Sequence, residues 1–436
     1  MKTSSEWLEQ ELCAWVRDDI ISADAAEQIR SRYEKSEAGR SNLASTIFTA
    51  FGAIMVSLGI IAIFAYNWEE LPRSARAVIA FALLISAQAF SVFVKLKRPE
   101  SSLFREASGV FLPIAFTTAL AIIAQTYQLG GDLVQFTLVV IALTLPSLYL
   151  INSTAAGAIF IFAIAALISA LYDGVGNLGW NEYHFKLTIA WIYFIVWLPW
   201  YIARLIKDRF SYSTRSLNLL FMLAIIAIVN SYLGGGLRDL ALHNSILLAS
   251  FWLANTLIYP NETRLFWKPV EEITKFAIAV MLLIYSCYSP YDRSYYSGYE
   301  YDLPVFFYIM AMFYFVLIGY FVHKIARERL YELIIPIAPF LFYAAFFAKT
   351  DMTLFFSFFT FVGAAAFIFG GVKRMDLALT NQGSIWLVAL ILIKFFSSNA
   401  SFLTKGVVFV IVGIAFMVFS VYVRKLIKES ANVVAK

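Results

Sequence analysis

The chain has 436 residues, of which 61% are hydrophobic and 14% are charged, with a formal net charge of +5. A soluble domain has about 45–50% apolar and about 25% charged residues, so the surplus of apolar side chains must face lipid. This composition excludes a soluble enzyme, a nucleic-acid-binding protein and a secreted disulfide-stabilised domain.

Residues 1–44 form a compositionally separate head, because 15 of the 44 are charged. Apolar residues between Trp7 and Val16 recur at three-to-four spacing, which predicts one amphipathic helix. Ser22 is typical of an N-cap and predicts a second helix that runs to about residue 37. The first residues show no basic-then-apolar signal sequence. We interpret the head as a cytoplasmic helical segment that either caps the membrane domain or docks a cytoplasmic protein partner.

The rest of the chain predicts an all-α, polytopic membrane protein, since a membrane helix needs about 20 apolar residues. Residues 45–424 form the transmembrane bundle and residues 425–436 a short cytoplasmic tail. About fourteen spans are expected, near 45–66, 75–94, 107–128, 133–151, 154–172, 186–205, 216–233, 244–260, 270–288, 304–323, 332–348, 351–371, 383–398 and 405–424.

The basic residues support an even number of spans with both termini inside. With the head in the cytoplasm, the inner segments carry 23 Lys and Arg residues and the outer loops carry 7. This asymmetry follows the positive-inside rule. The connection at 151–154 is the exception, because it is expected inside but is uncharged. The inward charge requires no partner beyond the headgroups of membrane lipids.

The patterns that indicate catalysis or a cofactor are not found in the sequence. His184, His243 and His323 have no acidic or Cys partner at ligand spacing, so we expect no metal site. We expect no catalytic residues and no cofactor, because no nucleotide-binding or zinc-protease motif occurs. No Asp or Glu falls in the middle third of an expected span, which argues against the simplest carboxylate proton relay.

Neutral polar side chains inside the expected spans are the better candidates for a functional lining. Buried amides must find hydrogen-bond partners in hydrocarbon. They either join neighbouring helices or line a path or a lipid headgroup site. The candidates, with one lysine, are Gln88, Thr118, Gln125, Gln128, Asn230, Asn255 and Lys394.

Two lysines lie in apolar surroundings, Lys275 in the ninth expected span and Lys394 in the thirteenth. Each is close enough to a helix end to extend its ammonium group to the membrane surface. The alternative for Lys394 is a buried functional cation. Prolines interrupt the third, fourth, sixth and eleventh spans, and broken helices often form substrate sites in transporters.

Several short motifs resemble a known family. They are DIISADAA at 19–26, GAIMVSLG at 52–59, NWEELP at 67–72, IIAQTYQLGGD at 122–132, and NQG at 381–383 with KG at 405–406. Together they resemble the bacterial predicted membrane proteins grouped as domain of unknown function 2157. The resemblance implies a bacterial inner-membrane location and brings no catalytic residues. It directs attention to two outer turns, with Asn67 and Trp68 in one and Gly130, Gly131 and Asp132 in the other. Each turn is either a tight interfacial connection or a recognition site.

Two functions from different classes follow. The first is a transporter-like protein that moves an amphipathic or lipid-linked envelope component. Its support is the number of spans, the broken helices and the amide-lined faces. The alternative is a non-catalytic membrane scaffold or sensor whose head docks a cytoplasmic partner. A membrane enzyme is a third hypothesis with less support.

Overall fold

The computed structural model describes Leu12, Trp15, Arg17, Ser22, residues 24–26, and residues 70–174, 179–233, 237–259, 268–287, 305–324, 330–348, 351–374 and 376–397. Contacts divide the chain into two units, Met1–Ile79 and Ala80–Lys436. Every regular element in the described residues is a helix, so the expected all-α class is confirmed for them.

In the first unit, the expected N-cap at Ser22 is confirmed. Residues 24–26 are helical, and the backbone N–H of Ala25 donates to Ser22 Oγ at 3.2 Å. A serine oxygen in this place satisfies one of the free N–H groups that every helix start exposes.

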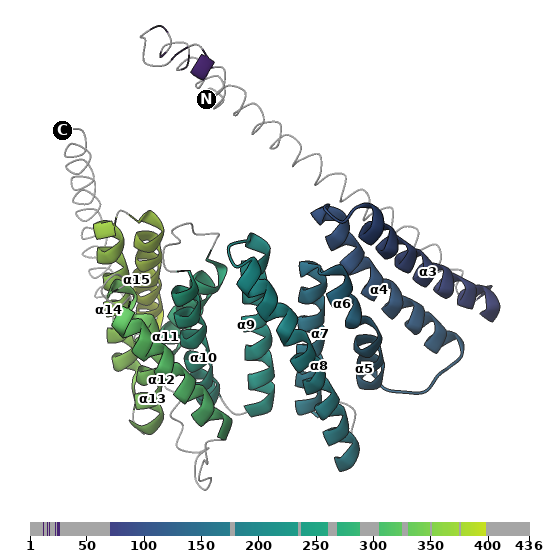
Figure 1. Ribbon diagram of the computed structural model, residues 1–436. Helices are drawn as coiled ribbons and strands as arrows, with labels where there is room; N and C mark the ends of the chain where they lie inside the picture. The colour runs from purple at the N-terminus through teal and green to yellow at the C-terminus, as the bar shows by residue number, and fades with distance from the viewer. Residues whose placement is uncertain are drawn as a thin grey trace. The chain divides into compact units, whose positions relative to one another are not determined.

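The second unit is a bundle of antiparallel helices (Figure 1). The helix α3 (Arg73–Lys97) begins in the first unit and ends in the second. The other helices of the second unit are α4 (Ser102–Thr126), α5 (Leu133–Thr144), α6 (Pro146–Ile151), α7 (Thr154–Tyr172), α8 (Trp180–Lys207), α9 (Tyr212–Leu233), α10 (Leu237–Ile258), α11 (Pro269–Cys287), α12 (Val305–Lys324), the 3-10 turn η3 (Leu330–Glu332), α13 (Ile334–Ala348), α14 (Thr353–Arg374) and α15 (Leu377–Ser397).

Within the described ranges, nine helical segments are long and apolar enough to cross a membrane. The pair α5 and α6 counts as one of them, and two shorter apolar stretches lie at Tyr308–His323 and Leu330–Ala345. Twelve of the fourteen expected spans coincide with described helices, whereas those near 45–66 and 405–424 lie outside the described residues. The chain is therefore a multi-pass membrane protein.

Large apolar side chains are exposed along the helices of this unit, as membrane insertion requires. Examples are Phe162 at 73% and Phe276 at 68% exposure. The helices differ in burial. In the membrane-length stretch of α10, 72% of the residues are buried, compared with 22% in that of α15. The helix α10 is thus among the more deeply buried helices, whereas few residues of α15 are buried.

Two apolar clusters form the core, and α9 contributes to both. One cluster joins α5 to α9 around Phe160 and Trp197, and the other joins α9 to α15 around Trp252, Phe321 and Phe367. Each of these five rings is almost completely buried.

Most basic residues of the described loops gather at one end of the bundle. The connections α3–α4, α8–α9 and α14–α15 carry Lys95, Lys97, Arg98 and Arg105, then Arg204, Lys207, Arg209 and Arg215, then Lys373 and Arg374. Because consecutive helices alternate in direction, these connections share one end, which we call the basic end (Figure 1).

The uncharged connection at 151–154 also lies at the basic end, and charged side chains from other helices cover it. Asn152 adopts a left-handed conformation with φ 54°, and Arg204 of α8 donates to its carbonyl at 3.3 Å. The carboxylate of Glu106 on α4 accepts from Ser153 Oγ at 2.7 Å and from the N–H of Ala155 at 2.8 Å. The Glu106 carboxylate therefore accepts hydrogen bonds from N–H groups at the start of α7, which have no partner within the helix.

Candidate functional site

A groove of about 450 Å³ opens between α8 and α12 in the second unit. Residues of α9, α10 and α11 line it as well, and we call it the α8–α12 groove. The lining residues are Tyr201, Leu205, Asn218, Phe221, Ile225, Leu247, Ser250, Phe251, Ala254, Asn255, Ile258, Val270, Ile309, Met310 and Phe313. Most of them are apolar, so the groove suits an apolar chain.

Stacked aromatic rings hold one wall of the groove in place. The rings of Tyr201, Trp197 and Phe221 of α9 pack against one another, with centroids 5.1 Å apart for Tyr201 and Trp197, 4.8 Å for Tyr201 and Phe221, and 5.9 Å for Trp197 and Phe221. Phe221 in turn meets Phe251 of α10 edge to face at 6.1 Å. Such ring pairs add to the burial energy of the side chains, so α8, α9 and α10 are fixed around the groove.

The few polar side chains that line the groove lie mostly in its half toward the basic end, among apolar ones. Tyr201 Oη donates to Asn218 Oδ1 at 2.9 Å, and Asn218 Nδ2 lies 3.4 Å from Tyr259 Oη. Tyr259 Oη donates to the carbonyl of Arg209 at 2.7 Å. The guanidinium of Arg215 lies 4.5 Å from the centroid of the Tyr259 ring. This chain of hydrogen bonds links the groove to the basic α8–α9 connection.

A buried ion cluster lies at the same end and joins α11 to η3, α14 and α15. Lys275 Nζ lies 3.2 Å from Glu272 and 3.1 Å from Glu332 of η3, and Arg374 of α14 lies 3.1 Å from Glu332. Gln382 of α15 donates to Glu272. Lys275 is 5% exposed and Glu332 is 3% exposed.

This arrangement corrects the interpretation of Lys275. The expectation that its ammonium group extends to the membrane surface is wrong, because the group points inward to two carboxylates. The Glu272 partner is three residues away on the same helix, but Glu332 is distant in sequence. Sequence spacing alone therefore does not reveal the ion cluster.

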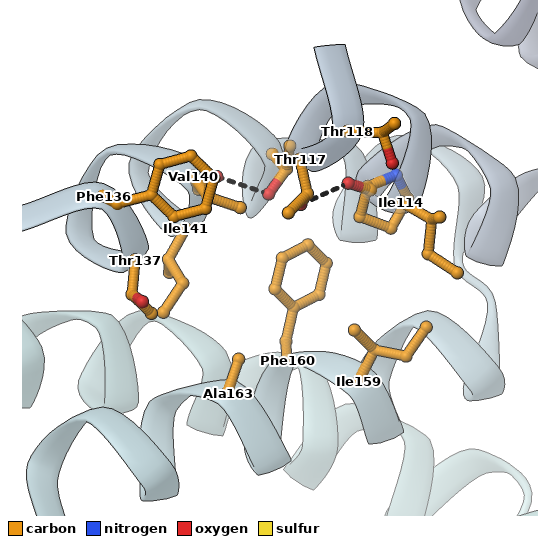
Figure 2. Close-up of a pocket in the computed structure, with 12 residues that line it drawn as sticks. Ile114, Thr117, Thr118, Phe136, Thr137, Val140, Ile141, Ile159, Phe160 and Ala163 are labelled. Carbon is orange, nitrogen blue, oxygen red and sulfur yellow. Dashed lines mark hydrogen bonds between the residues drawn. The ribbon is translucent and has the colours of Figure 1, made fainter. Parts of the chain in front are cut away.

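A second, smaller hollow of about 260 Å³ lies between α4, α5 and α7. Figure 2 shows the ring of Phe160 pointing into it from α7, toward Thr117 of α4. The hydroxyl of Thr117 donates to the carbonyl of Pro113 at 2.7 Å, and that of Thr144 to Val140 at 2.6 Å. Because these donors bond to their own helices, the hollow presents mainly apolar surface.

The sequence-predicted polar candidates lie at separate places. Asn255 lines the α8–α12 groove and donates to Glu271 of α11 at 3.3 Å. Thr118 lines the smaller hollow. Lys394 donates to the carbonyl of Ser286 at the end of α11, one of the carbonyls that a helix end leaves free.

The other predicted candidates line neither space. Gln88 on α3, Gln125 at the end of α4 and Gln128 after it are exposed, and Asn230 on α9 is partly buried. Among the described residues, no hydrogen bond joins any two of the seven candidates. Asn67 and Trp68 lie outside the described residues.

The turn at 127–132 is a tight connection with a charged cap. Gln128 has φ 51° and Gly131 has φ 135°, a conformation that favours glycine. Asp132 accepts the backbone N–H of Gln135 at 2.6 Å and thereby caps α5. The carboxylate also pairs with Lys186 of α8 at 3.0 Å, so this turn joins the start of α5 to α8.

The pKa of the Asp132 carboxyl is held below its usual value, first by the hydrogen bond from the Gln135 N–H and then by Lys186. The stabilisation is therefore present above the ordinary carboxyl pKa of about 3.9 and is lost as pH falls through the lowered pKa. Asp132→Asn keeps a cap but loses the ion pair, and we expect it to cost about 1 kcal/mol at pH 7. Thermal unfolding of the native protein and of Asp132→Asn in detergent, from pH 7 to pH 2, measures this difference in stability. A difference that persisted at pH 2 would contradict the contribution of the Asp132 carboxylate.

Among the described residues, no group of three His, Cys, Asp or Glu side chains is placed to hold a metal ion. The groove and the ion cluster were not found from the sequence, since each combines residues from three or more helices. The one local signal for the cluster is the run Glu271, Glu272 and Lys275 at the start of an apolar helix.

Residues 13–157 match the model of a family described as Predicted membrane protein (DUF2157). The match confirms the resemblance to that family over about a third of the chain. It includes α3 to α6 and therefore the α4 and α5 sides of the smaller hollow, whereas the α8–α12 groove lies beyond it. No curated protein and no solved structure matches the chain.

Proposed function

We propose that this multi-pass membrane protein is transporter-like and that it moves an amphipathic or lipid-linked component through the α8–α12 groove. The observation that carries the proposal is an apolar groove with a few polar side chains in its half toward the basic end. Asn218 and Tyr201 hydrogen-bond there, beside the apolar Leu205 and Ile258, while Leu247, Ile309 and Phe313 line the groove farther along. An amphipathic lipid is likewise mainly apolar, with its polar part toward one end.

The membrane placement is part of the proposal. About fourteen spans with both termini in the cytoplasm place the basic end at the cytoplasmic face, in agreement with the positive-inside rule. The family resemblance supports the bacterial inner membrane as the location. In this placement the polar end of the groove opens toward the cytoplasmic leaflet.

Reconstitution into liposomes of phosphatidylethanolamine and phosphatidylglycerol tests the proposal. A phospholipid with a fluorescent headgroup is added, and the loss of signal to an impermeant reductant reports its movement between leaflets. We expect the protein to accelerate this movement. We expect Ala254→Phe to return it to the protein-free rate, because Ala254 lines the groove and the larger ring would fill it.

The matched control is Ala203→Phe, which adds the same ring to an exposed position of α8 outside the groove. This variant should keep the native rate. If the native protein moves the phospholipid no faster than protein-free liposomes, the transporter-like proposal is wrong. The alternative, a non-catalytic scaffold or sensor whose head docks a cytoplasmic partner, would then take its place.

A further inference from the structure

The wall that α10 gives the α8–α12 groove is about one leaflet long. Leu247 and Ile258 both line it from α10, and they are eleven residues apart, which is about 16 Å along a helix. This is about half of the roughly 30 Å hydrocarbon core. Because Ile258 and Val270 lie at the basic end, this wall extends from that surface to about the middle of the bilayer.

Among the described residues of the α8–α9 connection, the charge beside the basic end of the groove is predominantly positive. The segment 204–215 carries Arg204, Lys207, Arg209 and Arg215 against the single acid Asp208. Its backbone is tied to the groove, because Tyr259 donates to the carbonyl of Arg209. The nearest acid on α11 is Glu271, which is fully buried and does not line the groove.

The basic side chains at this end differ in how they are held. Arg209 and Lys207 are exposed, and the Arg209 guanidinium lies 4.6 Å from the centroid of the Phe210 ring. Arg215 is buried beneath Tyr259. An anionic group at the groove mouth would thus meet two accessible cations, and cations near a membrane surface attract anionic headgroups.

We propose that the α8–α12 groove selects an anionic phospholipid from the leaflet at the basic end. One acyl chain lies along α9 and α10, and the phosphate headgroup lies beside Lys207 and Arg209. This inference rests on the proposed function, since it names the class of molecule that the groove holds. The amide of Asn218 and the hydroxyl of Tyr201 then lie at the depth where the chain joins the headgroup.

Photo-crosslinking of the full-length protein in liposomes tests the inference. The probes are phosphatidylglycerol and phosphatidylcholine, each with a diazirine in one chain and each at the same mole fraction in otherwise phosphatidylcholine vesicles. Mass spectrometry of the digested protein then locates the adducts. We expect adducts on the α9 and α10 segments near Phe251 and Ala254, with phosphatidylglycerol favoured about fivefold.

The variant Lys207→Gln/Arg209→Gln should lower the labelling by phosphatidylglycerol to that by phosphatidylcholine and leave the latter unchanged. The matched control is Lys373→Gln, which removes an exposed cation at the basic end on α14, whose residues do not line the groove. It should keep the preference. Raising the salt to 1 M should also remove the preference by screening, whereas soluble glycerol phosphate should not compete, because it has no chain.

The outcomes separate the two proposals. No adduct in the groove with either probe would overturn the proposed function itself. Adducts in the groove at equal yield for the two probes would leave that function standing and overturn the selection of an anionic headgroup. Competition by glycerol phosphate would show that a soluble phosphate, not a lipid, occupies the mouth.

Discussion

The replacement Lys275→Met is expected to destabilise the protein by about 3–5 kcal/mol, as removal of one partner from a buried ion pair does. Lys275 is buried between Glu272 and Glu332. Without the ammonium group, two carboxylates remain inside the helix bundle near each other. Glu332 retains Arg374 of α14 as a partner. The midpoint of thermal unfolding in detergent, with chemical denaturation for the free energy, measures the loss.

An ion pair whose carboxylate is exposed provides the control. Glu182 pairs with Lys186 at 2.9 Å, and the Glu182 side chain is 56% exposed. Lys186 keeps Asp132 as a partner, and an exposed carboxylate contributes about 0–1 kcal/mol through such a pair, so Glu182→Gln should unfold at nearly the native temperature. Equal losses for Lys275→Met and Glu182→Gln would contradict the burial of the ion cluster.

A double replacement separates the cost of leaving a buried carboxylate unpaired from the cost of losing the ion pair as a whole. Lys275→Met with Glu332→Leu removes a cation and an anion together, and a buried pair replaced by apolar residues is often nearly neutral. Arg374 loses Glu332, but it is partly exposed and can be solvated. We therefore expect the double variant to be more stable than Lys275→Met alone, which a double-mutant cycle detects as a coupling energy.

The spans were predictable because lipid requires long apolar stretches, and each stretch is local in sequence. The turn at Gly130, Gly131 and Asp132 was predictable in the same way, whereas the cap that Asp132 provides for α5 was not predicted. The break at Pro146 also follows from local chemistry, because proline has no N–H to donate. It separates α5 from α6 within one span. The breaks expected in the third, sixth and eleventh spans are wrong, because α4, α8 and α13 continue through Pro113, Pro199 and Pro339.

The partners of buried polar groups were not predictable, because they come from distant helices. Glu106 gives no sign in the sequence that it caps α7, forty-seven residues away at Ser153. Lys275 looked free to reach the membrane surface because Glu332 is far away in the chain. The α8–α12 groove depends in the same way on the packing of five helices. Only Asn255 was singled out beforehand, as a buried amide that needs a partner.

The replacement Gly383→Ala is expected to cost about 3 kcal/mol, the upper part of the range for overpacking. Gly383 lies where α15 crosses α14. A Cβ atom there would lie 2.6 Å from the carbonyl oxygen of Ala364 and 2.8 Å from the backbone nitrogen of Ile368. Backbone atoms cannot rotate away as a side chain can, so the two helices would have to separate. Small residues at helix crossings in membranes allow this close approach.

The control for this glycine is Gly319→Ala on α12, where a Cβ atom would meet nothing within 4 Å. Alanine favours the helix over glycine by about 1 kcal/mol, so this variant should be at least as stable as the native protein. Thermal unfolding of the two variants in one detergent gives the comparison. Equal stability of both would show that α14 and α15 are not in contact at Gly383.

Since Gln382 donates to Glu272, separating the helices should also loosen the ion cluster. Gly383→Ala and Lys275→Met should then be less than additive when combined.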